Sequence, residues 1–240
     1  MPSGRVPKKS DILLSGQNRL VSAFPPDDQR SFLEQSVRIE LHLGQVLCEA
    51  GEDLEFCYFP CRGVISIIAL MSSGCGAEIG LVGTEGMVGI GALLGDAKLH
   101  QQALVQGDGE AFKIPTASLL ALRDRSQAVQ EVLLGFANSF MNFTAQGAAC
   151  NALHKAEERL ARWILLVQDR LQSDVLPITH EFIADMLGTR RATVTVVANQ
   201  LENEGLIALG RREIRVLNRA GLVLASCECY GVMTRAIALL

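Results

Sequence analysis

The chain lacks a long apolar run, an N-terminal export signal and a strong excess of charge of one sign. Its longest apolar stretch, Val64 to Met71, is interrupted by a serine and is far too short for a bilayer, which needs about 20 apolar residues. No basic segment followed by an apolar one opens the chain. We therefore expect a cytoplasmic protein with no membrane partner. The formal net charge of −4 argues against nonspecific coating of nucleic acid, but not against reading a short site.

The sequence also lacks the residue spacings that enzymes and metal sites need. No nucleophile–base pair and no metal cluster shows usable spacing, so we expect no catalytic residue, no metal and no cofactor. Seven cysteines without an export signal argue against disulfide stapling. Cys48, Cys75 and Cys150 are interpreted as small hydrophobes. A redox role stays open for one of the close pairs, Cys57–Cys61 and Cys227–Cys229.

The stretch from Leu176 to Leu206 has the pattern of a helix-turn-helix, which lays one helix into the major groove of DNA. Thr179 is placed to cap a first helix, and Gly188 stands at the corner, where a positive φ is usually needed. Thr189 is then expected to cap a second helix. The buried face of that helix is expected at Val194, Val197 and Leu201. An ordinary αα-hairpin is the alternative interpretation.

The second helix is basic and polar over most of its length. Arg191, Thr195 and Asn199 are spaced i, i+4, i+8, so they share one face. Arginine can bind guanine or phosphate with two hydrogen bonds, and asparagine suits adenine. The following segment, 206–217, reads as two short strands with Gly210 at the turn, which predicts a winged helix-turn-helix. The residues expected at the DNA are Thr179, His180, Arg190, Arg191, Thr193, Thr195, Asn199, Arg211 and Arg212.

The segment from Val37 to about Ile114 reads as many short strands punctuated by glycine. Phe56–Phe59 and Gly63–Leu70 are read as separate strands. The turn residues 72–76 predict a hairpin that joins Gly63–Leu70 to the strand beginning at Ala77. Such spacing indicates an antiparallel β-roll or barrel.

From Ser118 to Leu153 the pattern changes to helix, and a further helix is expected from Ala156 to Leu171. Apolar residues on the first of these helices alternate in steps of four and three, the spacing by which two helices pair. The predicted dimer interface is Val129, Leu133, Phe136, Phe140, Phe143, Gly147 and Cys150. A second apolar side, which could rest on the β-roll, consists of Leu134, Met141, Ala145 and Ala148. Burial of the helix inside one domain is the alternative.

The sequence therefore predicts an α+β protein in three parts. Residues 18–126 would form an N-terminal antiparallel β-roll that senses an effector, and residues 127–154 a long central dimerisation helix. Residues 155–240 would form a winged helix-turn-helix DNA-binding domain.

A glycine-rich loop that runs into a short apolar turn occupies residues 83–95. This loop and the motif at 176–206, taken with the order of segments, resemble the Crp–Fnr family of bacterial transcription factors, named for the cyclic-AMP receptor and the fumarate–nitrate regulator. The resemblance extends from about Leu20 to Val216. It implies a homodimer with a cyclic-nucleotide-binding-like roll, bound to double-stranded DNA. It also implies a two-fold operator with half-sites about one helical turn apart, and RNA polymerase as a partner.

Two departures from the family bear on the effector. Cyclic-nucleotide binders of this fold place a glutamate after the glycine of the loop, and an arginine about ten residues on. Here Ile90 follows Gly89. The position expected to bind the phosphate falls near His100 and Gln101, and residues 63–122 contain no arginine. Cyclic AMP is therefore not expected, and the effector stays unidentified. The corresponding pocket would consist of Gly86, Gly89, Ile90, His100 and Gln101.

The departures extend to iron–sulfur ligation and to base readout. No cysteine precedes Cys48, so the N-terminal iron–sulfur cluster of the fumarate–nitrate branch is not expected. Ala192 and Val196 replace a glutamate and an arginine that family members often use, so the family's common operator is not assumed. We expect a sequence-specific DNA-binding regulator. The alternatives are a redox-responsive regulator using cysteines and a cyclic-nucleotide-binding regulatory protein.

Overall fold

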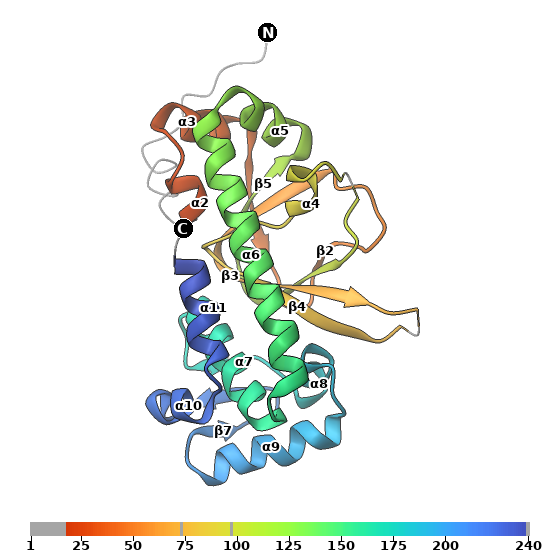
Figure 1. The fold of residues 1–240 in the computed structure, drawn as a ribbon, viewed down its shortest axis with the longest axis vertical. Helices are drawn as coiled ribbons and strands as arrows, with labels where there is room; N and C mark the ends of the chain where they lie inside the picture. Colours follow the sequence, from red (N-terminus) through yellow and green to blue (C-terminus); the bar gives the residue numbers. More distant parts are fainter. Residues whose placement is uncertain (1–17, 73, 97, 239–240) are drawn as a thin grey trace. The chain divides into compact units, whose positions relative to one another are not determined.

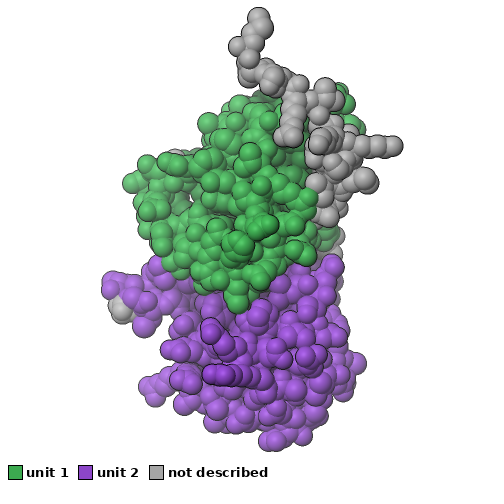
Figure 2. Space-filling view, turned by 180° about the vertical axis from the view of Figure 1, so that it is seen from behind, with its two compact units in different colours: residues 1–65, 82–138, 240 green, residues 66–81, 139–239 purple. Residues whose placement is uncertain are grey.

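The computed structural model describes residues 18–72, 74–96 and 98–238. The chain divides into two compact units, which Figure 2 colours separately. Of the described residues, the first unit comprises those in 18–65 and 82–138, and the second those in 66–81 and 139–238. The boundary between the two compact units thus falls within the central helix, between residues 138 and 139. The predicted division into a sensor domain ending at residue 126, a dimerisation helix ending at residue 154 and a DNA-binding domain stays a prediction.

The N-terminal sheet has five strands, and its antiparallel pairing fits the predicted roll. The order is β1-β5-β3-β4, with β2 also paired to β5 (Figure 1). Val37 lies opposite Lys113 and Leu41 opposite Gly109, which fixes the register of β1 on β5. The strands are β1 (Val37–Leu41), β2 (Val46–Cys48), β3 (Phe56–Leu70), β4 (Gly76–Val82) and β5 (Gln102–Pro115).

Strand β3 is longer than the sequence predicts. The segments Phe56–Phe59 and Gly63–Leu70, expected as separate strands, are one continuous strand. Gly63, the first residue of the second expected strand, lies inside β3 and marks a close approach of two backbones. Its φ is +91°, and a Cβ there would lie 2.8 Å from the carbonyl oxygen of Gly107 on β5. A glycine inside a strand often has this meaning.

In the described part of the chain, four short helices accompany this sheet: α2 (Arg19–Ser22), α3 (Pro26–Gln35), α4 (Ile90–Leu93) and α5 (Thr116–Arg125). The core of the first unit includes a cluster of aromatic rings around Phe32. The ring centroid of Phe32 lies 4.9 Å from that of Phe59 on β3 and 5.9 Å from that of Phe112 on β5, both edge to face. Such pairs stabilise a core beyond the burial of their apolar area.

The long helix α6 (Gln127–Leu153) faces its own chain with the side that was predicted to form the dimer interface. Val129 and Leu133 are fully buried within a single protomer, and Phe136 and Phe143 are at most 4% exposed. The predicted interface is therefore corrected, because side chains without free surface cannot meet a second chain. Of the remaining positions, Phe140 and Gly147 are half-buried and Cys150 is fully buried.

The second unit holds the last part of the chain. Helix α7 (Ala156–Leu171) matches its predicted bounds, and the helices α8 and α9 form the helix-turn-helix. A small antiparallel sheet of order β6-β8-β7 follows the winged pattern. Its elements are β6 (Val175–Leu176), α8 (His180–Leu187), α9 (Arg191–Asn203), β7 (Ile207–Leu209), β8 (Ile214–Val216), α10 (Arg219–Ala225) and α11 (Cys229–Ala238). Among the described residues, no helix is both long and apolar enough to cross a membrane.

Candidate functional site

The first helix of the helix-turn-helix, α8, begins and ends at the predicted residues. Thr179 is its N-cap, and the Thr179 hydroxyl oxygen accepts a hydrogen bond of 3.2 Å from the backbone N–H of Phe182. Gly188 is its C-cap, with φ +58° and ψ 41°. The left-handed conformation at Gly188 turns the chain toward α9, as a glycine at this position is expected to do.

The second helix, α9, begins one residue later than predicted. Thr189 is not its N-cap, because the first hydrogen bond of the helix runs from the backbone N–H of Val194 to the carbonyl of Arg190. Arg190 occupies the N-cap position without a side-chain cap bond. The buried face also differs by one residue, and consists of Val194, Ala198 and Leu201, while Val197 is half-buried.

The opposite side of α9 is exposed and carries the predicted reading residues. Arg190, Arg191 and Asn199 are exposed. Among the described residues, neither arginine forms an ion pair within the protein. Val196 is 67% exposed, so an apolar side chain also projects from this surface. Both guanidinium groups stand at the start of the helix, the end that contacts base edges in a helix-turn-helix.

Two predicted residues link the helices of the motif. Thr195 is half-buried, and its hydroxyl lies 3.3 Å from Nδ1 of His180 at the start of α8. The same hydroxyl donates to the carbonyl oxygen of Arg191, at 3.1 Å. Thr193 is half-buried as well. Thr195 thus helps to fix α9 on α8, which a reading helix needs.

The β7–β8 hairpin forms the wing and exposes two arginines at its tip. The backbone N–H of Gly210 donates to the carbonyl of Glu213 at 2.8 Å, which closes the turn. Arg211 and Arg212 lie between these residues and are exposed. A guanidinium nitrogen of Arg215 lies 3.7 Å from a carboxylate oxygen of Glu213, within ion-pair distance. Arginines at a wing tip are placed to contact backbone phosphates.

The first unit contains a cavity of about 620 Å³ that is a candidate effector site. Its charged lining is mostly acidic, and its walls come from β2, β3, β5 and the loop 49–55. The charged residues that line it are Glu49, Glu52, Asp53, Glu55, Lys98 and Lys113. The sequence interpretation missed these residues, although four acids within seven positions were a visible signal.

The predicted pocket residues do not line this cavity. Gly86 packs so closely that a Cβ there would lie 2.6 Å from the ring of Phe136. Gly89, with φ +110°, is the N-cap of α4, and Ile90 begins that helix half-buried. His100 is exposed, with Nε2 2.7 Å from a carboxylate oxygen of Asp96. Gln101 is half-buried.

The electrostatics of the cavity do not favour a phosphate. Lys113 directs its ammonium group over the ring of Phe56, at 3.8 Å from the centroid, in a cation–π contact. Burial and the nearby charge of Glu52 raise the pKa of Cys48 to about 11, so this lining thiol stays neutral. Burial likewise raises the pKa of Tyr58 to about 12. Four carboxylates therefore face two lysines, one of which is engaged with an aromatic ring.

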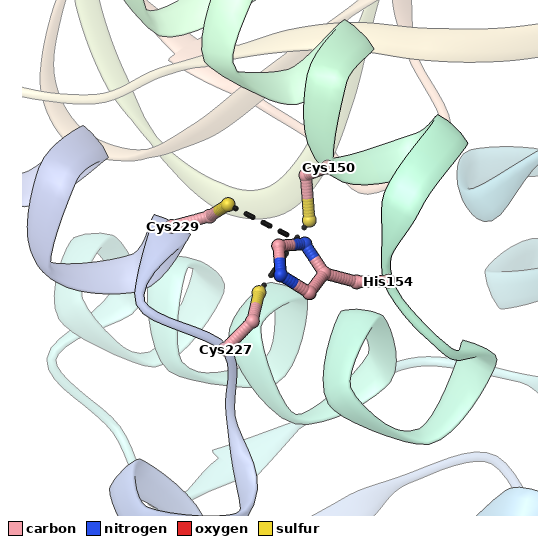
Figure 3. A group of neighbouring side chains, drawn as sticks. All are labelled: Cys150, His154, Cys227 and Cys229. Atoms are coloured by element: carbon pink, nitrogen blue, oxygen red, sulfur yellow. Dashed lines mark hydrogen bonds between the residues drawn. The ribbon is translucent and has the colours of Figure 1, made fainter.

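A separate group of potential metal ligands lies in the second unit. Cys150, which was predicted at the dimer interface, points its Sγ toward Cys227 at 3.5 Å. His154 and Cys229 complete the group, and the four ligand atoms all lie within 4.8 Å of one another (Figure 3). The sequence interpretation treated Cys150 as a small hydrophobe and did not connect it with the other three residues.

Comparison with known proteins relates both units to one family. A family model described as a Crp-like helix-turn-helix domain matches residues 158–224, and one described as a cyclic nucleotide-binding domain matches residues 38–126. The global nitrogen regulator of Synechococcus elongatus is 22% identical over 221 residues, which cover 88% of this chain and 98% of that protein.

Two solved structures share the fold. A transcriptional regulator of the Crp/Fnr family from Eubacterium rectale superposes with a TM-score of 0.71 at 16% identity, and the match covers 88% of this chain and 98% of that one. A regulator of the Crp family from Thermus thermophilus gives 0.68 at 20% identity, with 78% and 96% covered. The two family models follow each other along the chain, with the cyclic nucleotide-binding domain first and the helix-turn-helix domain second. The chain belongs to the Crp–Fnr family of transcriptional regulators.

Proposed function

We propose that the protein is a homodimeric transcriptional regulator that reads a two-fold operator with α9 of each protomer. The observation that carries this proposal is the start of α9, where Arg190 and Arg191 are exposed and unpaired among the described residues. A guanidinium group at this end of a recognition helix reaches the base edges of the major groove. Because neither guanidinium group forms an ion pair with another described residue, binding to DNA does not require an ion pair within the protein to be broken.

The other polar residues of the motif would divide the contacts. Asn199 suits adenine, and Val196 suits a thymine methyl group. Thr179 and His180 at the start of α8, with Arg211 and Arg212 in the wing, would contact phosphates and fix the register. Thr193 and Thr195 are half-buried and would contribute through their outer atoms.

The dimer would form along the exposed face of α6. Six residues on this face are exposed and alternate in steps of four and three, the heptad spacing of a paired helix. They are Leu134, Asn138, Met141, Ala145, Ala148 and Ala152. Leu134 and Met141 supply the apolar area, being 40% and 61% exposed in the single chain. Asn138 would fix the register, as a buried asparagine does in paired helices, and the alanines would let the two backbones approach closely.

The effector of this regulator would not be cyclic AMP. At the predicted nucleotide position, Ile90 offers no acceptor to a ribose hydroxyl and no arginine stands near His100 and Gln101. The separate 620 Å³ cavity has a mostly acidic lining, which disfavours a phosphate there as well. We also propose that the protein acts by binding rather than by catalysis, in the cytoplasm, with RNA polymerase as its partner at the promoter.

Selection of random duplexes by the full-length protein tests this function. The protein is mixed with a pool of randomised DNA, and bound molecules are amplified and sequenced over several rounds. We expect an inverted repeat whose half-sites are about one helical turn apart. A pool that shows no enrichment, or a single half-site without symmetry, would contradict the proposal.

A further inference from the structure

We propose that Cys150, His154, Cys227 and Cys229 hold a structural zinc ion. The four residues come from two places in the second unit. Cys150 and His154 lie one helical turn apart, Cys150 on α6 and His154 directly after it. Cys227 and Cys229 lie at the start of α11, with Cys229 as its first residue (Figure 3). Three thiols and one imidazole are a common ligand set of structural zinc.

The distances fit one tetrahedral ion. Zinc lies about 2.3 Å from sulfur and about 2.0 Å from nitrogen, so neighbouring ligand atoms of a tetrahedron lie about 3.5–3.8 Å apart. The Sγ atoms of Cys150 and Cys227 are 3.5 Å apart, and Sγ of Cys229 lies 3.7 Å from Nδ1 of His154. All four atoms lie within 4.8 Å of one another. A space of this size encloses one ion and leaves no room for several irons with bridging sulfides.

The surrounding groups orient the ligands. Nε2 of His154 lies 3.2 Å from a carboxylate oxygen of Glu228, so a proton on Nε2 leaves the Nδ1 lone pair directed into the group. A carboxylate on the outer nitrogen of a histidine is the usual support of a zinc ligand. Nε2 of Gln146 donates to Sγ of Cys229 at 3.0 Å. A packing role for small hydrophobic thiols would require neither contact.

The charge balance also suits a divalent cation. Three thiolates around one zinc carry a net charge of −1, and the buried guanidinium group of Arg162, which is 6% exposed, acts on Cys150 with a charge of the opposite sign. A coordinated zinc ion stabilises thiolates directly.

The site is closed, which points to a structural rather than a catalytic ion. The three cysteines are at most 7% exposed, and the protein fills all four positions of a tetrahedron. The ion would tie the end of α6 to the start of α11, beside Lys155, the cap of α7. Metal loss should therefore loosen the DNA-binding unit and weaken operator binding, a consequence that rests on the proposed function.

A disulfide between Cys150 and Cys227 is the competing chemistry, because their sulfurs are already 3.5 Å apart. It would form by loss of two protons and two electrons to an external oxidant. The disulfide would give no role to His154, Glu228 or Cys229, and for this reason the arrangement favours the metal.

The test measures metal in the full-length protein, purified under reducing conditions without chelator. We expect one zinc per chain by elemental analysis, and cobalt(II) exchanged into the site should show the visible absorption of a tetrahedral thiolate complex. Cys229→Ser and His154→Ala should each lose the ion. Cys75→Ser, which alters an exposed cysteine outside the group, should keep it.

Glu228→Gln guards against variants that do not fold, since the Glu228 side chain is 75% exposed. It should still bind one ion, about 10- to 100-fold more weakly. The proposal is overturned if reduced protein takes up neither zinc nor cobalt, or if all variants hold equal metal. It is also overturned if the sulfurs are isolated as a disulfide that binds no metal after reduction. The metal content is measured without DNA, so the two proposals can fail separately. A protein that holds one zinc ion but selects no operator would contradict the proposed function and leave the zinc site standing.

Discussion

The indole Nε1 of Trp163 donates a hydrogen bond of 3.0 Å to a carboxylate oxygen of Glu78, which joins α7 to β4 within the second unit. Ser66 donates a second bond of 2.7 Å to the other oxygen. Desolvation nevertheless raises the pKa of Glu78 from 4.5 to about 7, because it outweighs these two bonds and the charges of Arg162 and Arg170. A half-buried carboxyl group in the DNA-binding unit therefore titrates near neutral pH.

Glu78→Gln should change how stability depends on pH. The pKa of Glu78 is higher in the folded chain than in the unfolded one, so its stabilising protonation is fully present below about pH 4.5 and is lost as the pH rises through about 7. The loss is on the order of 3 kcal/mol. We expect the variant to lose less free energy of unfolding between pH 5 and pH 8, as measured by urea denaturation. Parallel curves for variant and parent would show that Glu78 does not carry this dependence.

Met141→Glu should separate the dimer. Met141 is 61% exposed in the single chain, so a charge there leaves the protomer folded but places two like charges opposite each other in the dimer. We expect folded monomers in sedimentation velocity, with weakened operator binding. Phe140→Glu is the matched comparison. The Phe140 ring packs so closely on Gly80 that a Cβ on Gly80 would lie 2.5 Å from the ring. Replacement of this ring by a charged side chain should therefore destabilise the fold of the protomer itself. A Met141→Glu protein that stays dimeric would place the interface elsewhere.

Thr179→Ala should destabilise the second unit through the loss of a helix cap. The Thr179 hydroxyl accepts the N–H of Phe182, and removal of such a cap costs about 1 kcal/mol. Thr189→Ala is the control, because Thr189 precedes α9 without capping it. The free energies of unfolding from denaturant titrations should differ between the two variants. Equal losses would mean that the cap of α8 contributes nothing measurable.

Cyclic AMP should leave the protein unchanged. Ile90 offers no acceptor to the ribose hydroxyl, and no arginine stands near the expected phosphate position at His100 and Gln101. A ligand shifts an equilibrium only by its differential affinity for the two states, so a nucleotide that does not bind cannot switch DNA binding. Calorimetry with millimolar cyclic AMP should give no saturable heat, and operator affinity should be equal with and without it. Micromolar binding that tightens the DNA complex would refute this.

Local signals made the helix-turn-helix predictable. The cap at Thr179, the turn at Gly188 and most of the buried face of α9 depend on neighbours within a few residues, and the sequence displays them directly. The start of α9 differs by one residue from the prediction, because both Thr189 and Arg190 precede the helix and only the bond from the Val194 N–H to the Arg190 carbonyl decides between them.

Long-range contacts account for what the sequence did not reveal. Helix α6 is apolar on two sides, and periodicity alone does not tell which side packs inside the protomer; Phe136 against Gly86 decides it. From the sequence, Phe56–Phe59 and Gly63–Leu70 look like two strands. Only the close approach of the β5 backbone to Gly63 explains why a glycine stands inside one continuous strand. Cys150 and His154 meet Cys227 and Cys229 only through the fold, since the two pairs are far apart in the chain and neither has the spacing of a zinc motif.

Arg191→Ala tests DNA reading by α9 most directly. The operator obtained by selection is bound to parent and variant in fluorescence anisotropy titrations at several salt concentrations, and the selection is repeated with the variant. We expect a loss of about 1–3 kcal/mol and a relaxed preference at one base pair in each half-site. Arg211→Ala, at the wing tip, should instead weaken all sequences evenly and reduce the salt dependence. Unchanged affinity and an unchanged selected sequence for Arg191→Ala would contradict the account.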